Sequence, residues 1–203
     1  MKYPEDFINQ VIQGDCLEIM KLMPDKCVDL CLTDFPYGVE ESYDEFVDTA
    51  QNVKDLIGRS MPEILRVSKR VLLTCGTRQI GWYPQSNWIL AWTNPAGAGM
   101  NPWGFTCWQP VLAYGKDPYL GNSMGARPDV IQHGETAQKD FGHPCPKPIQ
   151  FWKKLLIRGS VKETDVVFDP FLGSGTTAVA AKQLGRKFIG IEISEKYCKI
   201  ARD

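Results

Sequence analysis

An acidic residue, a proline and an aromatic residue stand together at residues 33–38, Thr-Asp-Phe-Pro-Tyr-Gly. The Asp34 carboxylate can accept a hydrogen bond from an amino group. The Phe35 carbonyl can accept a second one, because Pro36 biases the residue before it toward an extended conformation. Tyr37 can stack on a ring. These residue types in this order predict a site that holds a flat, amine-bearing ring, although a strand end followed by a proline turn with a core aromatic residue would look the same.

The position of this hexapeptide supports a ligand site. The apolar run at residues 27–32 predicts a buried strand that ends at Asp34. In open α/β sheets, ligands bind at the carboxyl ends of strands.

A glycine-rich turn near the C-terminus forms a second candidate site. Residues 165–168 predict a strand, and the turn Asp-Pro-Phe-Leu-Gly-Ser-Gly-Thr-Thr follows at residues 169–177. Glycines let the backbone approach a ligand closely. A further predicted strand at residues 187–191 ends at Glu192, and an acid in that place can hold both hydroxyls of a ribose. The pattern therefore predicts half of a doubly wound nucleotide site.

Three cofactors compete for this turn. An ATP P-loop needs a lysine after the last glycine, and none follows Gly175. The dinucleotide pattern GxGxxG is met with Ala178 at the third glycine position, where alanine is allowed. S-adenosylmethionine offers an adenosine and a zwitterionic amino acid without a pyrophosphate. Asp169 could receive its ammonium group, so an acid at the turn suits this cofactor better than a diphosphate.

Composition bounds the class of protein. The 203 residues, 43% hydrophobic and 23% charged, suffice for one domain with a sizeable core, and the net charge of -1 gives no global basic field. Seven cysteines without a CxxC pair and only two histidines argue against a zinc site, so no metal site is predicted. The cysteine pattern and the lack of a signal-peptide core or of a long apolar run predict a cytoplasmic protein with no membrane association.

The remaining elements place the two sites on one sheet. Strands are expected at residues 7–13 and 71–75, and a helix at 17–23 that stops before a proline. A further helix is expected within residues 43–69, interrupted between Gly58 and Pro62. Strands that alternate with helices predict an α/β fold, with a mostly parallel sheet and helices on both of its faces.

The middle of the chain differs from both ends. Residues 80–142 are rich in aromatic residues, glycine and proline, with long loops and two plausible strands at 88–92 and 110–114. Long loops in a compact domain are usually functional or disordered. Aromatic residues there could stack on bases or fill the core. For the region as a whole, a substrate surface is the preferred interpretation.

Taken together, the motifs resemble those of the DNA amino-methyltransferases, in the β-ordered group whose catalytic motif precedes the cofactor motif. The catalytic pattern (D/N/S)-P-P-(Y/F/W) stands here as residues 34–37, with Phe35 in place of the first proline. The HPxxKP segment stands intact at residues 143–148, DPFxGSGTT at 169–177, and Ile-Gly-Ile-Glu follows at 189–192. The resemblance implies a single Rossmann-like methyltransferase domain over residues 1–203, with 80–142 as the target-recognition region.

The resemblance also implies roles for individual residues. Asp34 and the Phe35 carbonyl would hold the target amine, next to Pro36, and Tyr37 would stack on a base flipped out of double-stranded DNA. The nitrogen would attack the methyl group directly, without a strong base. Glu192 would hold the ribose, Asp15 the adenine amino group and Lys147 the carboxylate of S-adenosylmethionine. The full predicted cofactor site comprises Asp15, Cys16, Lys147, Asp169, Phe171, Gly173, Ser174, Gly175, Thr176, Thr177 and Glu192.

The implied reaction is methylation of the exocyclic amino group of adenine in DNA. Asp34 stands where other members have serine, and by resemblance an aspartate there favours adenine. Either side chain could accept a hydrogen bond from an amine, so hydrogen bonding alone does not decide the base. The alternatives are N4-cytosine methylation, the same chemistry on RNA or a free nucleotide, and a non-catalytic module that binds cofactor and nucleic acid. A nicotinamide dehydrogenase is more distant. The resemblance places the protein in the cytoplasm of a bacterial or phage-infected cell, where a second copy could complete the DNA surface of this short chain.

Overall fold

The core of the molecule is a twisted sheet between two layers of helices. The computed structural model describes residues 1–40, 45–94, 99–134 and 147–203. Within them the strands are β1 (Gln10–Gln13), β2 (Leu30–Asp34), β3 (Val71–Thr74), β4 (Trp88–Thr93), β7 (Trp108–Tyr114), β8 (Val130–Gln132), β9 (Val166–Asp169), β10 (Lys187–Glu192) and the separate hairpin of β5 (Met100–Asn101) and β6 (Gly104–Phe105). The helices are α1 (Cys16–Met20), α2 (Ala50–Val67), α3 (Pro118–Gly121), α4 (Ile149–Gly159), α5 (Thr176–Gln183) and α6 (Glu195–Arg202), with a 3-10 turn at Ile80–Trp82.

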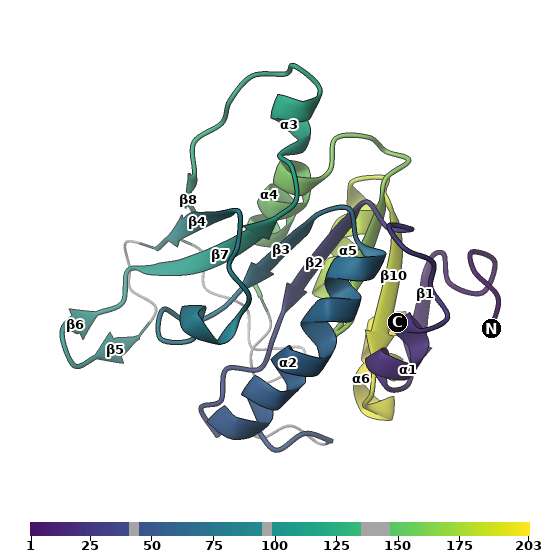
Figure 1. The fold of residues 1–203 in the computed structure, drawn as a ribbon, viewed down its shortest axis with the longest axis horizontal. Coiled ribbons are helices and arrows are strands. Elements are labelled where there is room, and N and C mark those ends of the chain that lie inside the picture. Colours follow the sequence, from purple (N-terminus) through teal and green to yellow (C-terminus); the bar gives the residue numbers. More distant parts are fainter. Residues whose placement is uncertain (41–44, 95–98, 135–146) are drawn as a thin grey trace.

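The strand order of the main sheet is β1-β10-β9-β2-β3-β7-β4-β8 (Figure 1). The first five strands in this order run parallel, β7 runs antiparallel to both of its neighbours, and β8 is parallel to β4. The chain leaves β9 toward β10 on one side, and leaves β2 toward β3 on the other. The strand order therefore reverses between β9 and β2, and such a switch point opens a crevice at the carboxyl ends of the strands.

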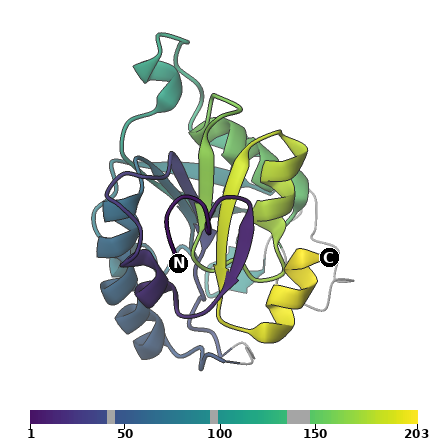
Figure 2. The same cartoon turned by 90° about the vertical axis from the view of Figure 1, so that its right-hand side faces the viewer.

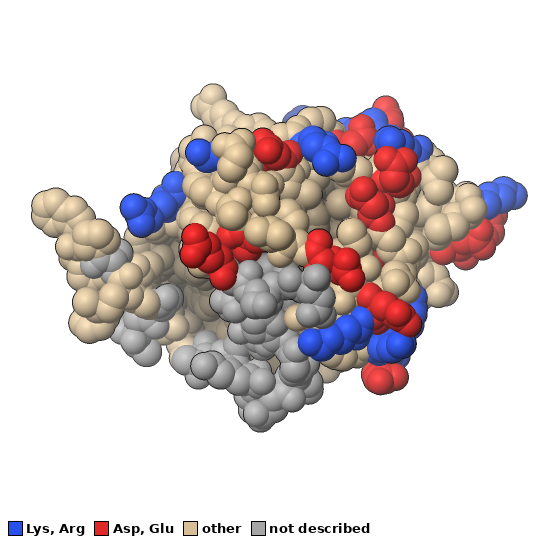
Figure 3. Space-filling model, turned by 90° about the horizontal axis from the view of Figure 1, so that it is seen from below, with Lys and Arg blue, Asp and Glu red and all other residues tan. Residues whose placement is uncertain are grey.

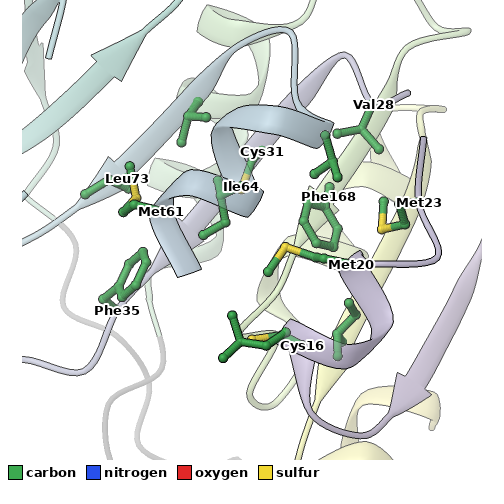
Figure 4. Close-up of a cluster of buried hydrophobic side chains, with 14 of the residues drawn as sticks. Cys16, Met20, Met23, Val28, Cys31, Phe35, Met61, Ile64, Leu73 and Phe168 are labelled. Atoms are coloured by element: carbon green, nitrogen blue, oxygen red, sulfur yellow. The ribbon is translucent and has the colours of Figure 1, made fainter. Parts of the chain in front are cut away.

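Helices cover both faces of this sheet, which confirms the predicted fold class. Figure 2 shows α1 and α2 (purple and blue) on one face, with α4, α5 and α6 (green to yellow) on the other. One hydrophobic core lies beneath α1 and α2, and a second lies beneath α4 and α5. In the first, Met61 and Ile64 of α2 face Cys31 of β2, Phe168 of β9 and Met20 of α1 (Figure 4). Burial on both faces explains why the parallel strands read as continuous apolar runs.

Capping residues set the helix starts. The side chain of Asp15 accepts from the Leu17 amide at the start of α1, Thr49 accepts from Asn52 at the start of α2, and Ser194 accepts from Tyr197 at the start of α6. Each cap satisfies an amide that has no partner inside its helix. Among the described residues, no helix combines the length and the apolar character that crossing a membrane requires.

The expected interruption of the helix between Gly58 and Pro62 is wrong. Helix α2 runs without a break through Pro62, which is exposed. The proline removes one amide donor, but the Gly58 carbonyl opposite it lies at an exposed position where water can serve as the partner. Burial of Val53, Ile57 and Met61 along one stripe of the helix outweighs this local cost.

Gly190 is a position where the sheet has no space for a side chain. A Cβ atom on Gly190 would lie 2.5 Å from Leu172 Cδ2, in the turn that follows β9. We predict that Gly190→Ala lowers the free energy of unfolding by about 1–3 kcal/mol, because it overpacks the core beneath that turn. Urea denaturation measures this effect.

Gly58→Ala is the matched control, since nothing lies within 4 Å of its Cβ position in the middle of α2. It should stabilise the protein by about 0.5–1 kcal/mol, because alanine favours helix over glycine. Equal effects of the two substitutions would contradict the packing of Leu172 on β10.

Candidate active site

The two candidate sites meet in one cleft at the switch point of the sheet. Helices α1 and α6, which follow β1 and β10, lie at the lower edge of the sheet in Figure 1, so the carboxyl ends of the parallel strands are there. The cleft encloses about 1160 Å³ when the space open to solvent at its mouth is included. Its walls contain Asp34 from β2, Asp169 from β9, Glu192 from β10 and Asp15 from the end of β1.

Asp34 has its two carboxylate oxygens in different surroundings. Oδ1 accepts hydrogen bonds from the Tyr37 hydroxyl, at 2.8 Å, and from the Thr74 hydroxyl at the end of β3. Oδ2 is 2.5 Å from the Lys147 ammonium nitrogen. Burial and the neighbouring Asp34 charge raise the pKa of Tyr37 well above its usual range, so its hydroxyl stays protonated and donates. Protein donors therefore fix the orientation of the carboxylate.

The Phe35 side chain lies in the core, away from solvent. The residue is 1% exposed, and its ring centroid lies 4.6 Å from that of Phe171 and 5.4 Å from that of Tyr83. This packing explains how a phenylalanine replaces the first proline of the expected pattern. Phe35 and Pro36 both belong to the wall of the cleft.

The loop after Pro36 is held from two sides. The buried Gln79 side-chain amide donates to the Tyr37 carbonyl, at 2.9 Å. The buried Asp48 carboxylate accepts from the amides of Gly38 and Val39, at 2.7 and 3.0 Å. Gly38 has a φ of 69°, and a Cβ there would lie 2.9 Å from Ala50 Cα, so only glycine fits. These bonds fix the backbone that follows Asp34.

Asp169 is the centre of a buried hydrogen-bond network. Its Oδ1 accepts from the Thr33 hydroxyl at 2.7 Å and from the Phe171 amide at 3.0 Å. Its Oδ2 accepts from the Thr177 hydroxyl at 2.6 Å, and that hydroxyl in turn accepts from the Trp152 indole at 2.7 Å. Because an indole N–H can only donate, the Thr177 proton is directed to Asp169. Burial raises the pKa of Asp169 to about 6, while these hydrogen bonds oppose the rise.

Glu192 and Asp15 complete the opposite wall of the cleft. Glu192 accepts from the Gly173 amide at 2.7 Å and from the Ser194 amide at 2.8 Å, and burial raises its pKa. A carboxylate has about four acceptor positions, so Glu192 keeps roughly two for a ligand. One oxygen of Asp15 caps α1 at Leu17, and the residue is exposed. Both acids can therefore accept hydrogen bonds from a ligand without losing their structural partners.

Most of the predicted site residues lie in the wall of this cleft. These are Asp15, Cys16, Asp34, Phe35, Pro36, Lys147, Asp169, Phe171, Gly173, Ser174, Thr176, Thr177 and Glu192. Tyr37 does not line it and contacts Asp34 instead. Gly175 does not line it either: with a φ of 97° it packs against α6, where a Cβ would lie 3.0 Å from Ala201 Cβ. Of the segment at residues 143–148, the first four residues lie outside the described part of the chain.

Several residues of the site have roles that the sequence alone does not predict. Thr33 and Thr74 are polar residues at the ends of apolar strands, and a polar residue in that position indicates a possible site residue. Gln79 and Trp152 carried no such signal, because their partners lie 42 and 25 residues away in the sequence. Asp48 carried none either, although its partners are only 10 and 9 residues away. In the part of the chain that the structure describes, no group of three or more metal-binding side chains occurs.

Comparisons with known proteins agree with this geometry. The profile of a protein family described as DNA methylase matches residues 84–203. YubD of Escherichia coli (strain K12) is 29% identical over 206 residues, which span 94% of this chain and 87% of that protein. M.HinfI of Haemophilus influenzae, named as a type II methyltransferase, is 29% identical over 250 residues, which span 97% of this chain and 68% of that protein.

Solved structures share the fold over nearly the whole chain. The complex of M1.HpyAVI with SAM has a TM-score of 0.66 at 22% identity, covering 95% of this chain and 97% of its own. The PvuII DNA methyltransferase, named as cytosine-N4-specific, has a TM-score of 0.71 at 16% identity, covering 97% and 88%. At these identities the likeness concerns the fold.

The hydrogen bond from Thr33 to Asp169 gives a test of the network. We predict that Thr33→Val lowers the free energy of unfolding at pH 7 by about 1–3 kcal/mol, because a buried carboxylate loses a donor. The bond stabilises the ionised form of Asp169, whose pKa is about 6. Losing the bond raises this pKa further in the variant, so the penalty should be full only above the variant's pKa and should shrink as the pH falls toward and below 6.

Urea denaturation at pH 7 and pH 5 checks both parts of this prediction. Thr77→Val, at an exposed position, is the control and should change stability little at either pH. A Thr33→Val penalty that grows on acidification would contradict the role assigned to the bond.

Proposed function

This chain belongs to the DNA methylase family, which methylates exocyclic amino groups of bases, and on that premise we propose that it methylates N6 of adenine in double-stranded DNA. The methyl donor of the family is S-adenosylmethionine. The observation that supports the proposal most is that two groups of residues, each suited to a different ligand, line one cleft. Asp34 and the Phe35 backbone suit an amine, while Asp169, Glu192 and the glycine-rich turn suit an adenosine joined to an amino acid.

The cofactor half of the cleft fits S-adenosylmethionine by its donor set. Glu192 keeps acceptor positions for the two ribose hydroxyls, and Asp15 has a second oxygen for the adenine amino group. Asp169 has one acceptor position left beside three protein donors, which suits an ammonium group. The bound cofactor supplies an electrophilic methyl group on a sulfonium.

In the target half, we infer that Asp34 and the Phe35 carbonyl hold the amino group of the base. Two acceptors direct the two N–H bonds, so that the nitrogen lone pair points to the donor side of the cleft. Holding the reacting groups in this way converts an encounter into a unimolecular step, so positioning supplies most of the catalysis. The base must leave the duplex to reach this cleft.

Residues 80–142 are proposed to carry the contacts that recognise the target sequence. Strand β4 runs in the same direction as β3, because both are antiparallel to β7. The β5–β6 hairpin, which follows β4, therefore lies on the edge of the sheet where the cleft opens (Figure 1). The side chains of Met100, Trp103 and Phe105 are 71%, 99% and 74% exposed. Exposed aromatic side chains at this edge of the sheet are suited to stacking on bases.

The charges around the β5–β6 hairpin favour contacts with bases over contacts with phosphates. Figure 3 views the molecule from the cleft side, and acidic and basic side chains are interspersed there. The projection at its left, the β5–β6 hairpin, carries neither. Ion pairs with phosphates, which need lysine or arginine, must come from other surfaces.

N4-cytosine methylation is the second candidate. The solved structure with the TM-score of 0.71 is named as cytosine-N4-specific. The amino group of cytosine would meet the same two acceptors, so hydrogen bonding alone does not separate the bases. Adenine is preferred because Asp34 stands at the first position of the catalytic pattern.

Methyl transfer from labelled S-adenosylmethionine to unmethylated DNA, followed by nucleoside mass analysis, tests the proposal. We expect N6-methyladenine. N4-methylcytosine would keep the chemistry and overturn the choice of base. Methylation of RNA alone, or binding of the cofactor without any product, would overturn the proposed substrate or the catalytic role.

Two substitutions should separate the halves of the cleft. Asp34→Ala should lower the transfer rate by at least about 100-fold, because the amine loses its positioning acceptor, and should not weaken cofactor binding. Glu192→Gln should weaken cofactor binding by about 10-fold or more, since it removes a charged acceptor. Calorimetry with S-adenosylhomocysteine and single-turnover transfer measure the two effects. An Asp34→Ala enzyme with most of its activity would remove Asp34 from the mechanism.

The exposed hairpin gives a further test. Trp103→Ala should weaken duplex binding by about 5- to 100-fold, the loss expected for one base-stacking contact, without changing stability. Trp88, 62% exposed, begins β4 and lies at the opposite end of that strand from the cleft. Trp88→Ala should therefore leave binding unchanged. Fluorescence anisotropy with a labelled duplex measures both, and equal losses would contradict a role of the hairpin in DNA contact.

A further inference from the structure

Lys147 occupies the position in the cleft where an amine is expected to bind. Its ammonium nitrogen is 2.5 Å from Asp34 Oδ2 and lies 5.0 Å from the centroid of the Tyr37 ring, over its face. The carboxylate of Asp34 is one of the two acceptors proposed above for the target amine, and Tyr37 is the ring that the resemblance assigns to stacking. The Lys147 side chain is 12% exposed, so the contact lies largely out of water.

The other oxygen of Asp34 cannot take over the amine. Oδ1 already accepts from Tyr37 and Thr74, and two donors fill its two lone pairs. Neither of those residues lines the cleft, whereas Asp34 and Lys147 both do. Oδ2 is therefore the acceptor that faces a ligand, and Lys147 holds it.

We propose that Lys147 stands in for the target amine in the free enzyme, and that it leaves Asp34 when the carboxylate of the cofactor offers it another partner. This inference rests on the proposed function. A neutral amino group is a weaker partner for a buried carboxylate than an ammonium is. A base can therefore bind Asp34 well only after Lys147 has moved. The cleft contains both Lys147 and the cofactor wall of Asp169 and Glu192, so the move stays within one site.

The exchange also places a negative charge, and no positive one, next to the reacting nitrogen. With Lys147 on the cofactor carboxylate, Asp34 is left as the anion nearest to the target nitrogen, which gains positive charge as it attacks. With Lys147 still on Asp34, that charge would develop beside an ammonium group. The proposed exchange thus makes cofactor binding a condition for productive binding of the base.

The measurable consequence is a coupling between the two ligands. S-adenosylhomocysteine should raise the affinity of wild-type enzyme for a duplex containing its methylation site by about 10-fold or more. Methylthioadenosine shares the adenosine but has no carboxylate, so it should raise duplex affinity by less than about 2-fold. A duplex whose target base lacks the amino group should show no coupling with either ligand.

Lys147→Met tests the residue itself, since methionine keeps the length of the chain and removes the charge. This variant should bind the duplex tightly without cofactor, and the coupling should fall below about 2-fold. Lys153→Met removes the same charge from α4 and should keep the wild-type coupling, which separates the exchange from general attraction to phosphates. Fluorescence anisotropy at saturating ligand measures duplex affinity in each case.

The result that would overturn the inference is an equal coupling in wild-type and Lys147→Met enzyme, or no coupling in the wild type. Methyl transfer by the wild-type enzyme is measured separately. Transfer without the predicted coupling contradicts the role of Lys147 alone, whereas a lack of transfer contradicts the proposed function.

Discussion

The hydrogen bond from Thr33 to Asp169 joins two motifs that are 136 residues apart in the chain. It can form because β2 and β9 are parallel neighbours, with Leu30 opposite Val167 and Cys31 opposite Phe168. This register brings the last residues of both strands to the same edge of the sheet. A shift by one residue would turn Thr33 to the opposite face. The proposed amine-binding and cofactor-binding halves of the cleft therefore depend on one strand pairing.

The interactions around that bond make the cleft rigid. The rings of Phe35 and Phe171 pack beneath its two halves, while Trp152 fixes the hydroxyl that donates to Asp169. Gln79 and Asp48 hold the backbone after Pro36. A reaction that relies on the placement of a nitrogen and a methyl group needs such a preorganised frame, because small displacements of either group are costly in rate. The buried polar groups of this frame are satisfied by one another, as burial requires.

The sequence predicted the parts of the molecule that local patterns encode. Continuous apolar runs predicted the parallel strands, and residues of the turn at 169–177 lie with Glu192 in one cleft. It did not predict the roles of Gln79 and Asp48, whose partners are brought near only by the fold, nor the continuity of α2 through Pro62, where tertiary burial outweighs a local signal. Gly175 was expected in the cofactor site, and its close approach to Ala201 could not be foreseen without the position of α6.

The central claim is that Asp34 and the Phe35 carbonyl hold the amino group of a base beside the cofactor. A crystal structure with S-adenosylhomocysteine and a duplex containing the methylated site tests it most directly. The account predicts an extruded adenine whose amino nitrogen lies about 2.7–3.2 Å from Asp34 Oδ2 and from the Phe35 carbonyl oxygen. An extruded base whose amino group contacts neither acceptor would contradict it.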